Sequence, residues 1–359
     1  MASSDDRLIW LDLEMNGLDL EKHTIVEIAV ATSDWHCKNY KEGPDIVIHH
    51  SQDVIDNMNE WCVEHHTKSG LITQILSSHV SLYDAESAVI EFLSLEQITP
   101  GLGILGGNSV FVDRWFIQKH MPRLAEYLSK KIIDCSTIKE LILRWQPLRF
   151  RKVPYKQMKH RASDDIRESI NELKYYYKHM FISSAKQQIL LRSPPYEWEI
   201  MQNPKTHIVW LKINFLYNNK DFINDLTIII TDGNLNLINE LYIENISKSN
   251  SQLLIDFLHK NILVNRISPL AGEFVDVDRV VMSQICPDFV KVCHYRNIDV
   301  DIISTLCSKW FPNVYKQRPI VDNSAQVNSR PKLKSYIELL KYYRANIFRQ
   351  DMDRDNSSK

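Results

Sequence analysis

The sequence lacks an excess of charge of either sign. Among its 359 residues, 43 Lys and Arg stand against 45 Asp and Glu, which gives a formal net charge of -2. Proteins that grip long nucleic acids do so through many lysine and arginine contacts to phosphates. The near-neutral balance therefore argues against a broad surface of that kind, whereas a small or short substrate remains open.

Paired cysteines and long apolar runs are also missing. The 6 cysteines are scattered and form no C-x-x-C pair, so we expect reduced thiols packed inside the protein. No apolar run approaches the roughly 20 residues that a membrane helix needs. The acidic opening MASSDDRLIW turns at once into core sequence and leaves no room for a signal or transit peptide. These absences predict a cytoplasmic protein without a membrane partner, and leave a nuclear or mitochondrial share open.

What the sequence does contain is a long internal repeat. Its length and its 44% of hydrophobic residues predict two domains. LIWLDLEMN at 8–16 aligns with HIVWLKINF at 207–215 when Trp10 is placed over Trp210. VDRWFIQKHMP at 112–122 likewise matches VDRVVMSQICP at 277–287, and ESINELKYYYKHMF at 168–181 matches KSYIELLKYYRANI at 334–347. Because the order is the same in both halves, we interpret the chain as a tandem duplication.

The hydrophobic pattern predicts an α/β fold. LIWLDLEM and TIVEIAVATSD are typical of two strands that pair as a hairpin across the polar loop NGLDLEKH. Apolar residues three and four apart then predict helices in AESAVIEFLSL, DRWFIQKHMPRLAEYL, STIKELILRW and DDIRESINELKYYYKHMF. Strands followed by interleaved helices favour a mixed sheet flanked by helices in each copy. We expect a first domain at 1–182, a linker at 183–206, a second domain at 207–348 and a frayed tail at 349–359.

Acidic residues stand at unusual places in the first copy. The two-residue period of a strand puts Asp12 and Glu14 on one face, where buried carboxylates are costly unless a cation, a basic partner or water satisfies them. A solvent-facing edge strand is the alternative. Asp113 and Asp165 stand near predicted helix starts, where acids also serve as caps. His160 precedes Asp165 by five residues, and taken alone it suits a structural histidine equally well.

Taken together, these four acids and His160 resemble the catalytic set of the oligoribonuclease family, exonucleases with an Asp-Glu-Asp-Asp set and a catalytic histidine. The matching stretches cover 8–180 nearly continuously: WLDLEMNGLD, NEWCVEHHTKSGL, GNSVFVDRWF, IDCSTIKELILRW and HRASDDIRESINELKYY. The resemblance implies ribonuclease H-like domains and 3′-to-5′ hydrolysis of very short RNA, ideally dinucleotides, to nucleoside 5′-monophosphates. Val110, Phe111 and Val112 depart from the small or polar residues usual in the family, which predicts an altered floor of the site.

The resemblance also implies a role for each residue of the site. Two divalent ions, Mg²⁺ or Mn²⁺, suit carboxylate oxygens; Asp12 bridges both ions, Glu14 and Asp165 hold one, and Asp113 holds the other. His160 takes a proton from the attacking water, a role that fits an ordinary pKa of about 6.5. The implied substrate-binding residues are Leu18 as a wedge against a base, Trp61 as a stacking partner, and His66, Ser109, Ser136 and Thr137 around the 5′-phosphate. The alternatives are a core aromatic for Trp61 and a surface histidine for His66.

The second copy has lost this acidic set. Lys212 and Asn214 replace Asp12 and Glu14, and only Asp278 survives, opposite Asp113. We align Gln326 with His160 and Pro331 with Asp165. A lone carboxylate does not hold two divalent ions, and Lys212 places a cation where a metal ion belongs. We therefore expect the second copy to be catalytically inactive.

One stretch is retained in the second copy and lost from the first. HYRNIDV at 294–300 matches the family stretch HYRNLDV, whereas the first copy has Lys130 and Lys131 at the places of Tyr295 and Arg296. In the family this Tyr and Arg reach across a homodimer to complete the partner's site. We therefore predict a monomeric intrachain pseudo-dimer whose one working site uses Tyr295 and Arg296, because an Arg fork grips phosphate and a Tyr ring stacks on a base. A packing remnant is the alternative.

Two competing functions remain open at this point. A related exonuclease that trims longer RNA or DNA 3′ ends would cleave oligomers of about ten nucleotides at rates near those of dinucleotides. A non-catalytic nucleotide-binding or scaffold protein is disfavoured, because drift would be expected to break at least one member of the five-residue catalytic set.

Overall fold

The computed structural model of the protein describes residues 7–154, 161–182, 206–216, 219–246, 251–262, 264–321 and 328–349. Contacts divide the chain into two compact units. The first unit comprises residues 1–135 and 153–177, and the second unit comprises residues 136–152 and 178–359. Each unit contains one five-stranded sheet, as the duplication predicts.

The first sheet is mixed, with the order β3-β2-β1-β4-β5. Its strands are β1 (Arg7–Met15), β2 (Ile25–Asp34), β3 (Lys41–Val47), β4 (Gly103–Gly107) and β5 (Leu128–Asp134). β1, β2 and β3 form an antiparallel meander, and β4 and β5 run parallel to β1. The predicted hairpin of β1 and β2 is confirmed, with Glu14 paired to Glu27 across it. Because β1 lies between β2 and β4, the edge-strand alternative for Asp12 and Glu14 is wrong.

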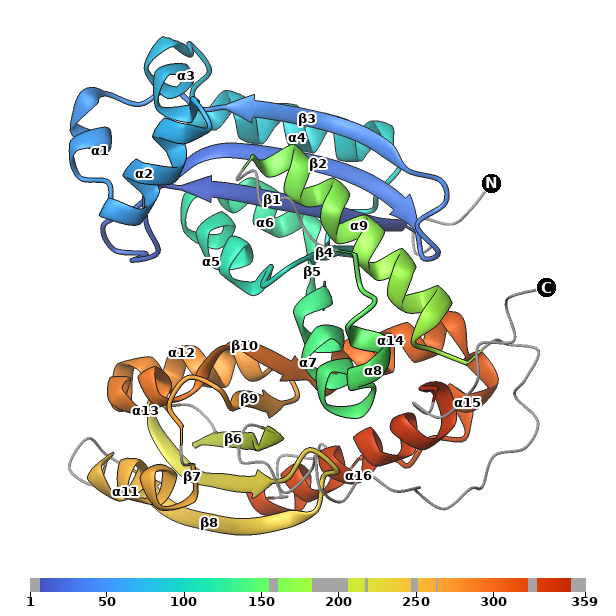
Figure 1. Cartoon of the computed structure of the whole chain (residues 1–359). Coiled ribbons are helices and arrows are strands. Elements are labelled where there is room, and N and C mark those ends of the chain that lie inside the picture. The colour runs from blue at the N-terminus through green and yellow to red at the C-terminus, as the bar shows by residue number, and fades with distance from the viewer. Residues whose placement is uncertain are drawn as a thin grey trace. The chain divides into compact units, whose positions relative to one another are not determined.

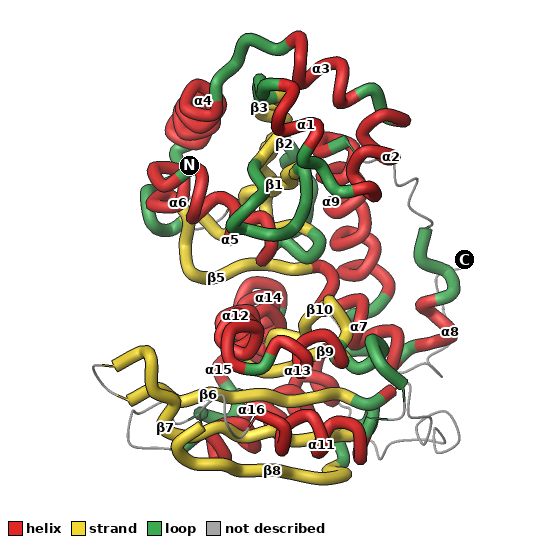
Figure 2. The backbone as a smooth tube through the Cα atoms, turned by 90° about the vertical axis from the view of Figure 1, so that its left-hand side faces the viewer, coloured by secondary structure: helices red, strands yellow, loops and turns green. Residues whose placement is uncertain are grey.

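Helices cover both faces of the first sheet. They are α1 (Gln52–Asp56), α2 (Glu60–Lys68), α3 (Leu71–Ser77), α4 (Leu82–Leu95), α5 (Phe111–His120), α6 (Pro122–Tyr127) and α9 (Ala162–His179). Helix α9 crosses one face of the sheet, and α4 and α6 lie against the other face (Figures 1 and 2). The single helix predicted from Asp113 onward is two helices, because Pro122 has no N–H to continue the hydrogen-bond ladder.

The second sheet repeats the order of the first. Its strands β6 (Ile208–Leu216), β7 (Asn219–Thr231), β8 (Leu237–Ile246), β9 (Pro269–Gly272) and β10 (His294–Asp299) are arranged β10-β9-β6-β7-β8. Each copy also contains an equivalent buried hydrogen bond. Trp10 Nε1 donates to Ser33 Oγ at 2.8 Å in the first copy, and Trp210 Nε1 donates to Thr231 Oγ1 at 3.0 Å in the second. Two α/β domains, each built on a five-stranded mixed sheet with the same strand order, are therefore present.

The second unit also holds two helices from the first copy. Its own helices are α11 (Ser251–Asn261), α12 (Val275–Ile285), α13 (Pro287–Val292), α14 (Val300–Trp310), α15 (Pro312–Lys316) and α16 (Ser329–Ile347). To these are added α7 (Cys135–Trp145), from Ser136 onward, and α8 (Pro147–Phe150). Trp145 Nε1 donates to the carbonyl of Gly233 at 2.8 Å, and Arg144 Nε donates to that of Thr206 at 3.0 Å. The compact units thus do not follow the boundary between the two copies.

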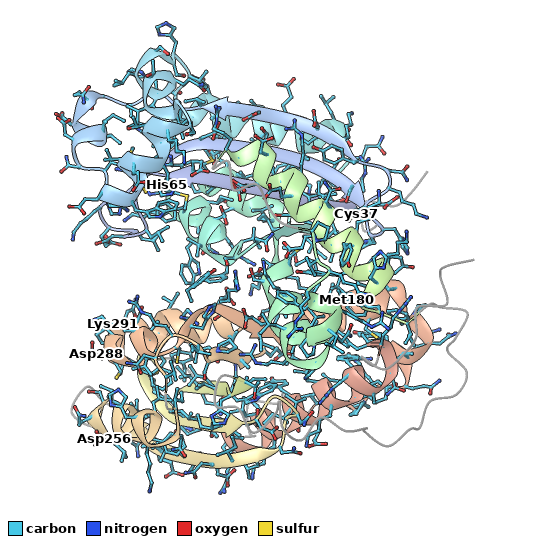
Figure 3. All side chains as sticks on the ribbon, viewed as in Figure 1. Cys37, His65, Met180, Asp256, Asp288 and Lys291 are labelled. Atoms are coloured by element: carbon cyan, nitrogen blue, oxygen red, sulfur yellow. The ribbon has the colours of Figure 1, made fainter. Side chains whose placement is uncertain are left out.

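The ends of α9 and α16 are joined by a short symmetric ladder inside the second unit. Met180, labelled in Figure 3, accepts from the backbone N–H of Arg349 at 2.9 Å. Ile182 donates in the same way to the carbonyl of Ile347 at 2.9 Å. These bonds pair Met180 with Ile347 and Ile182 with Arg349 as equivalent residues of the two copies. No helix in the described ranges has the length and apolar character to cross a membrane.

The buried tryptophan of the second sheet gives a test of its core. Trp210 is fully buried in β6, so Trp210→Ala should lower the free energy of unfolding by about 3–5 kcal/mol, measured by urea denaturation. The control is Ile320→Ala, because Ile320 is 94% exposed and the change should stay within about 0.5 kcal/mol. Equal midpoints for the two variants would contradict the position of Trp210.

Candidate active site

Three carboxylates from distant parts of the chain meet in the first unit. β1 carries Asp12 and Glu14, and the first turn of α9 carries Asp165. One oxygen atom of each side chain lies within 4.8 Å of the others. Oxygen atoms at this spacing are the donors that hard divalent cations take in proteins. The arrangement therefore fits a metal ion by its donor chemistry, and these three residues form the acidic triad of the site.

Asp113 lies beside the acidic triad on α5. Its Oδ1 accepts a hydrogen bond from the backbone N–H of Leu13 at 3.0 Å, which fixes the carboxylate against the strand between Asp12 and Glu14. Asp113 does not belong to the group of oxygen atoms within 4.8 Å of one another. Its negative charge nevertheless helps to raise the pKa of Asp12. The structure thus places four predicted acids on or against one strand. His160 lies outside the described residues.

These carboxyl groups are difficult to ionise together. Burial, followed by the charges of Asp113 and Asp165, raises the pKa of Asp12 well above its usual range. Burial and then Asp165 raise the pKa of Glu14 to about 8. The pKa of Asp113 is raised by burial to about 7, against the opposing hydrogen bond from Leu13. Without a cation, the site therefore retains protons near neutral pH, and a bound divalent cation would favour their release.

A fifth acid, not identified from the sequence, lies beside the acidic triad on the neighbouring strand. Glu27 on β2 is fully buried and accepts from Arg161 Nε at 2.9 Å, from Arg161 Nη2 at 2.6 Å and from the backbone N–H of Ala162 at 3.2 Å. The side-chain hydrogen bonds to Glu27 raise the pKa of Arg161. The available signal was one acid inside the apolar run IVEIAVA, where a buried charge requires a partner.

The predicted base-contacting residues are open to solvent. Leu18, between β1 and β2, is 69% exposed, and Trp61 on α2 is 53% exposed. The Trp61 ring stacks on His65, with 3.9 Å between centroids and 19° between planes. Figure 3 labels His65 on this helix. The core-aromatic alternative for Trp61 is therefore wrong.

His66 occupies the opposite face of α2. It is fully buried, its Nε2 lies 3.0 Å from the carbonyl oxygen of Met15, and its Nδ1 lies 4.0 Å from Glu14 Oε2. The surface-histidine alternative is wrong as well. This imidazole packs where β1 ends, directly beside an acid of the triad.

The remaining residues predicted for the phosphate lie at two helix starts. Ser109 precedes α5 with a φ of 53°, and its N–H donates to Asp134 Oδ1 at 2.8 Å. Ser136 and Thr137 are buried in the first turn of α7. The Thr137 hydroxyl donates to the carbonyl of Asn297 and accepts from the N–H of Asp299, both at 3.1 Å. Thr137 is thus engaged with β10 of the second unit, and its role toward phosphate stays a prediction.

The departure from the family before Asp113 has a structural role. Val110 and Phe111 are buried, and the ring of Phe111 meets that of Trp115 edge to face at 5.0 Å. These side chains fill the core around α5. An effect on the floor of the site stays a prediction.

Tyr295 and Arg296 stand on β10 in the second unit. Tyr295 is 60% exposed, whereas Arg296 donates from Nη1 to Glu140 Oε1 at 3.1 Å. Burial alone would raise the pKa of Glu140, but Arg144, followed by His294 and Arg296, holds it below its usual range. Glu140 belongs to α7, so the guanidinium of Arg296 is held by a helix of the first copy. No sequence pattern indicated that Glu140, 156 residues away, would be the partner of Arg296.

The second copy has basic or neutral residues at the equivalent places. Lys212 Nζ lies 3.5 Å from Asp278 Oδ2, and Asn214 Nδ2 donates to both oxygens of Asp225 at 3.3 and 3.2 Å. The ladder at Met180 and Ile347 puts Lys332, and not Pro331, at the place of Asp165, so the alignment expected from the sequence is wrong by one residue. Gln326 lies outside the described residues. Across the described ranges, no second cluster of three metal-ligating side chains occurs.

Residues 9–173 match the family RNase_T, described as Exonuclease. A probable oligoribonuclease of Drosophila melanogaster is 48% identical over 177 residues, which make up 49% of this chain and 83% of that protein. The chain belongs to the oligoribonuclease family. The oligoribonuclease of Aliivibrio fischeri is 47% identical over 50% of this chain and 99% of its own length. The human mitochondrial oligoribonuclease is 42% identical over 52% of this chain and 80% of its own length.

Solved structures of exonuclease I resemble the whole chain only weakly. A zinc-bound Escherichia coli complex with single-stranded DNA covers 94% of this chain and 90% of its own, at 10% identity and a TM-score of 0.41. A likeness at this level carries no weight for fold or function. The oligoribonuclease relationship and the acidic triad together identify the chain as an oligoribonuclease-like 3′-to-5′ exonuclease with a metal-binding acidic site.

The raised pKa of Glu14 predicts how metal-free protein responds to pH. Between the ordinary value of 4.5 and the folded value of about 8, the folded state binds a proton that the unfolded state has released. Stability therefore falls as pH rises from about 5 to 8. Glu14→Gln removes this loss, so in EDTA its unfolding temperature should exceed that of the wild type at pH 8, and Mg²⁺ should stabilise the wild type more than the variant.

Differential scanning fluorimetry at pH 5 and pH 8 measures both effects. Glu91→Gln, at an exposed acid on α4, serves as the matched control and should follow the wild type. A wild type and a Glu14→Gln variant with the same pH dependence would contradict the assignment of the shift to this site.

Proposed function

We propose that this chain hydrolyses very short RNA, with dinucleotides preferred, from the 3′ end to nucleoside 5′-monophosphates. The observation that carries this proposal is the acidic triad of Asp12, Glu14 and Asp165, formed within an oligoribonuclease-like sequence. Asp113 is held by Leu13 on the same strand and supplies a fourth carboxylate. The names of the relatives support RNA oligomers as the substrate class.

The acids would hold two divalent ions, Mg²⁺ or Mn²⁺. When bound, such a pair stabilises the attacking and leaving oxygens of a phosphodiester undergoing in-line displacement. Asp12, Glu14 and Asp165 would hold these ions together with Asp113. The Leu13 N–H keeps the carboxylate of Asp113 oriented before substrate arrives. His160 would remove the proton from the attacking water.

Exposed apolar residues would contact the bases of the substrate, and polar residues would bind its 5′-phosphate. Leu18 and Trp61 present open surfaces, as base wedging and base stacking require, and His65 supports one face of Trp61. His66, Ser109, Ser136 and Thr137 would close around the 5′-phosphate. Residues that enclose the 5′-phosphate would limit the length of the RNA, because they leave no space for a further nucleotide.

We further propose that the second copy completes this single site. Tyr295 has the exposure needed to stack on a base, and Arg296 is held by α7, the same helix whose first turn carries Ser136 and Thr137. The two copies, at 1–182 and 207–348, would then work as an intrachain pseudo-dimer, and the chain would act as a cytoplasmic monomer. Lys212 beside Asp278 supports an inactive second copy.

A length series tests the preferred substrate. Purified full-length chain with Mg²⁺ and labelled RNAs of two to ten nucleotides should cleave the dinucleotide fastest, with rates that decline as length increases. Asp12→Ala is the blank and should be inactive, because the acidic triad loses a ligand. Equal rates for two and ten nucleotides would instead favour an exonuclease that trims longer 3′ ends.

Substitution of Tyr295 and Arg296 tests the contribution of the second copy. Arg296→Ala combined with Tyr295→Phe should lower kcat/KM for a dinucleotide by about tenfold to a hundredfold, since a hydrogen bond to a charged group is worth about 1.5–3 kcal/mol. The matched control carries Lys130→Ala and Lys131→Ala at the equivalent places in the first copy. Unchanged turnover in the Tyr295 and Arg296 variant would show that the second copy does not complete the site.

A further inference from the structure

Glu27 and Arg161 form a buried ion pair that no step of the proposed reaction uses. Glu27 is fully buried, and Arg161 approaches both of its oxygens from Nε, at 2.9 and 3.3 Å, and Oε1 from Nη2 at 2.6 Å. Arg161 Nη2 also donates to Gln74 Oε1 on α3 at 3.0 Å. The pair therefore connects β2, α3 and the residue that directly precedes α9.

The Glu27–Arg161 pair lies next to two members of the acidic triad. Glu27 is paired with Glu14 across β1 and β2. On the other side, the carbonyl of Arg161 accepts from the N–H of Asp165 at 3.0 Å, so the pair grips the turn that presents Asp165. Arg161 also follows His160 directly in the chain. A shift of Arg161 would move the backbone on which both of these groups depend.

The second copy keeps one of the two interactions made by Glu27 and lacks the other. Asp225 pairs with Asn214 as Glu27 pairs with Glu14, and its Oδ1 accepts from the backbone N–H of Ser329 at 2.7 Å, at the start of α16. The first copy has the same bond from Ala162. Asn328, however, stands where the first copy has Arg161. The anchor of the helix backbone is thus present in both copies, whereas the guanidinium accompanies only the copy with the acidic triad.

We propose that Arg161 is a positioning residue, which through Glu27 fixes the first turn of α9 so that Asp165 meets Asp12 and Glu14 in the geometry that binds metal. This role rests on the proposed function. A planar guanidinium that grips a carboxylate at two points restrains rotation as well as distance, which a single ammonium does not. Arg161 also provides the counter-charge to Glu27, whose negative charge lies next to Asp12 and Glu14.

Arg161→Gln tests this role in the full-length chain. It removes the guanidinium and leaves the Ala162 bond to Glu27 in place. We expect kcat for dinucleotide hydrolysis to fall by about 10–100-fold, KM to change little, and the affinity for Mn²⁺, measured by electron paramagnetic resonance, to fall by about tenfold or more. Arg167→Gln is the matched control, because Arg167 lies on the same helix and forms a surface pair with Glu42 at 2.9 Å. The control should retain both kcat and Mn²⁺ affinity.

A second variant keeps the test decisive if Arg161→Gln does not fold. Arg161→Lys retains the charge but not the two-point grip, so it should unfold near the wild-type temperature and still show weaker Mn²⁺ binding and a lower kcat. Wild-type kcat and Mn²⁺ affinity in Arg161→Lys, or in a folded Arg161→Gln, would overturn the proposal. If the wild type binds Mn²⁺ but does not cleave dinucleotides, the proposed function fails, whereas the Mn²⁺ affinities of the variants still decide the role of Arg161.

Discussion

Repulsion among buried carboxylates is the constraint on which the rest of the first unit depends. Asp12 and Glu14 lie on the central strand, Asp113 is tied to the same strand through Leu13, and Asp165 arrives on α9. Besides burial, the charges of Asp113, Asp165 and Glu14 all raise the pKa of Asp12. A cluster of this kind persists only on a rigid frame with a cation within reach. The sheet supplies the frame, and Arg161 supplies a permanent cation that is paired with Glu27 on the neighbouring strand β2.

The second copy meets the same constraint by a different route. It keeps the sheet order and the buried tryptophan, but Lys212 faces Asp278, so that the protein carries its own counter-ion. This copy therefore needs no metal for charge balance. Its β10 still presents Tyr295, and a helix of the first copy holds its Arg296. Residues 136–152 pack with the second unit, so the two compact units do not coincide with the two copies.

Sequence patterns revealed the features that are local. The first hairpin, the long helices and the repeat follow from hydrophobic periodicity, whereas GILGG and LSKKIID are too short for a period to identify β4 and β5. The two-residue period correctly placed Asp12 and Glu14 on one face of β1, but it did not show that this central strand is covered on both faces. Ion pairs between residues distant in the chain could not be predicted from local sequence patterns. Glu27 lies 134 residues from Arg161, and Glu140 lies 156 residues from Arg296. The family resemblance, and not periodicity, identified Asp12, Glu14 and Asp165 as one site.

The central claim is that the acids of the first copy bind divalent ions and that the second copy binds none. Titration of the full-length chain with Mn²⁺, followed by electron paramagnetic resonance, measures the number of bound ions directly. We expect two ions per wild-type chain, the same number in Lys212→Ala, and a loss of binding in Asp12→Asn. Ions that remain bound with unchanged affinity in Asp12→Asn would contradict the claim.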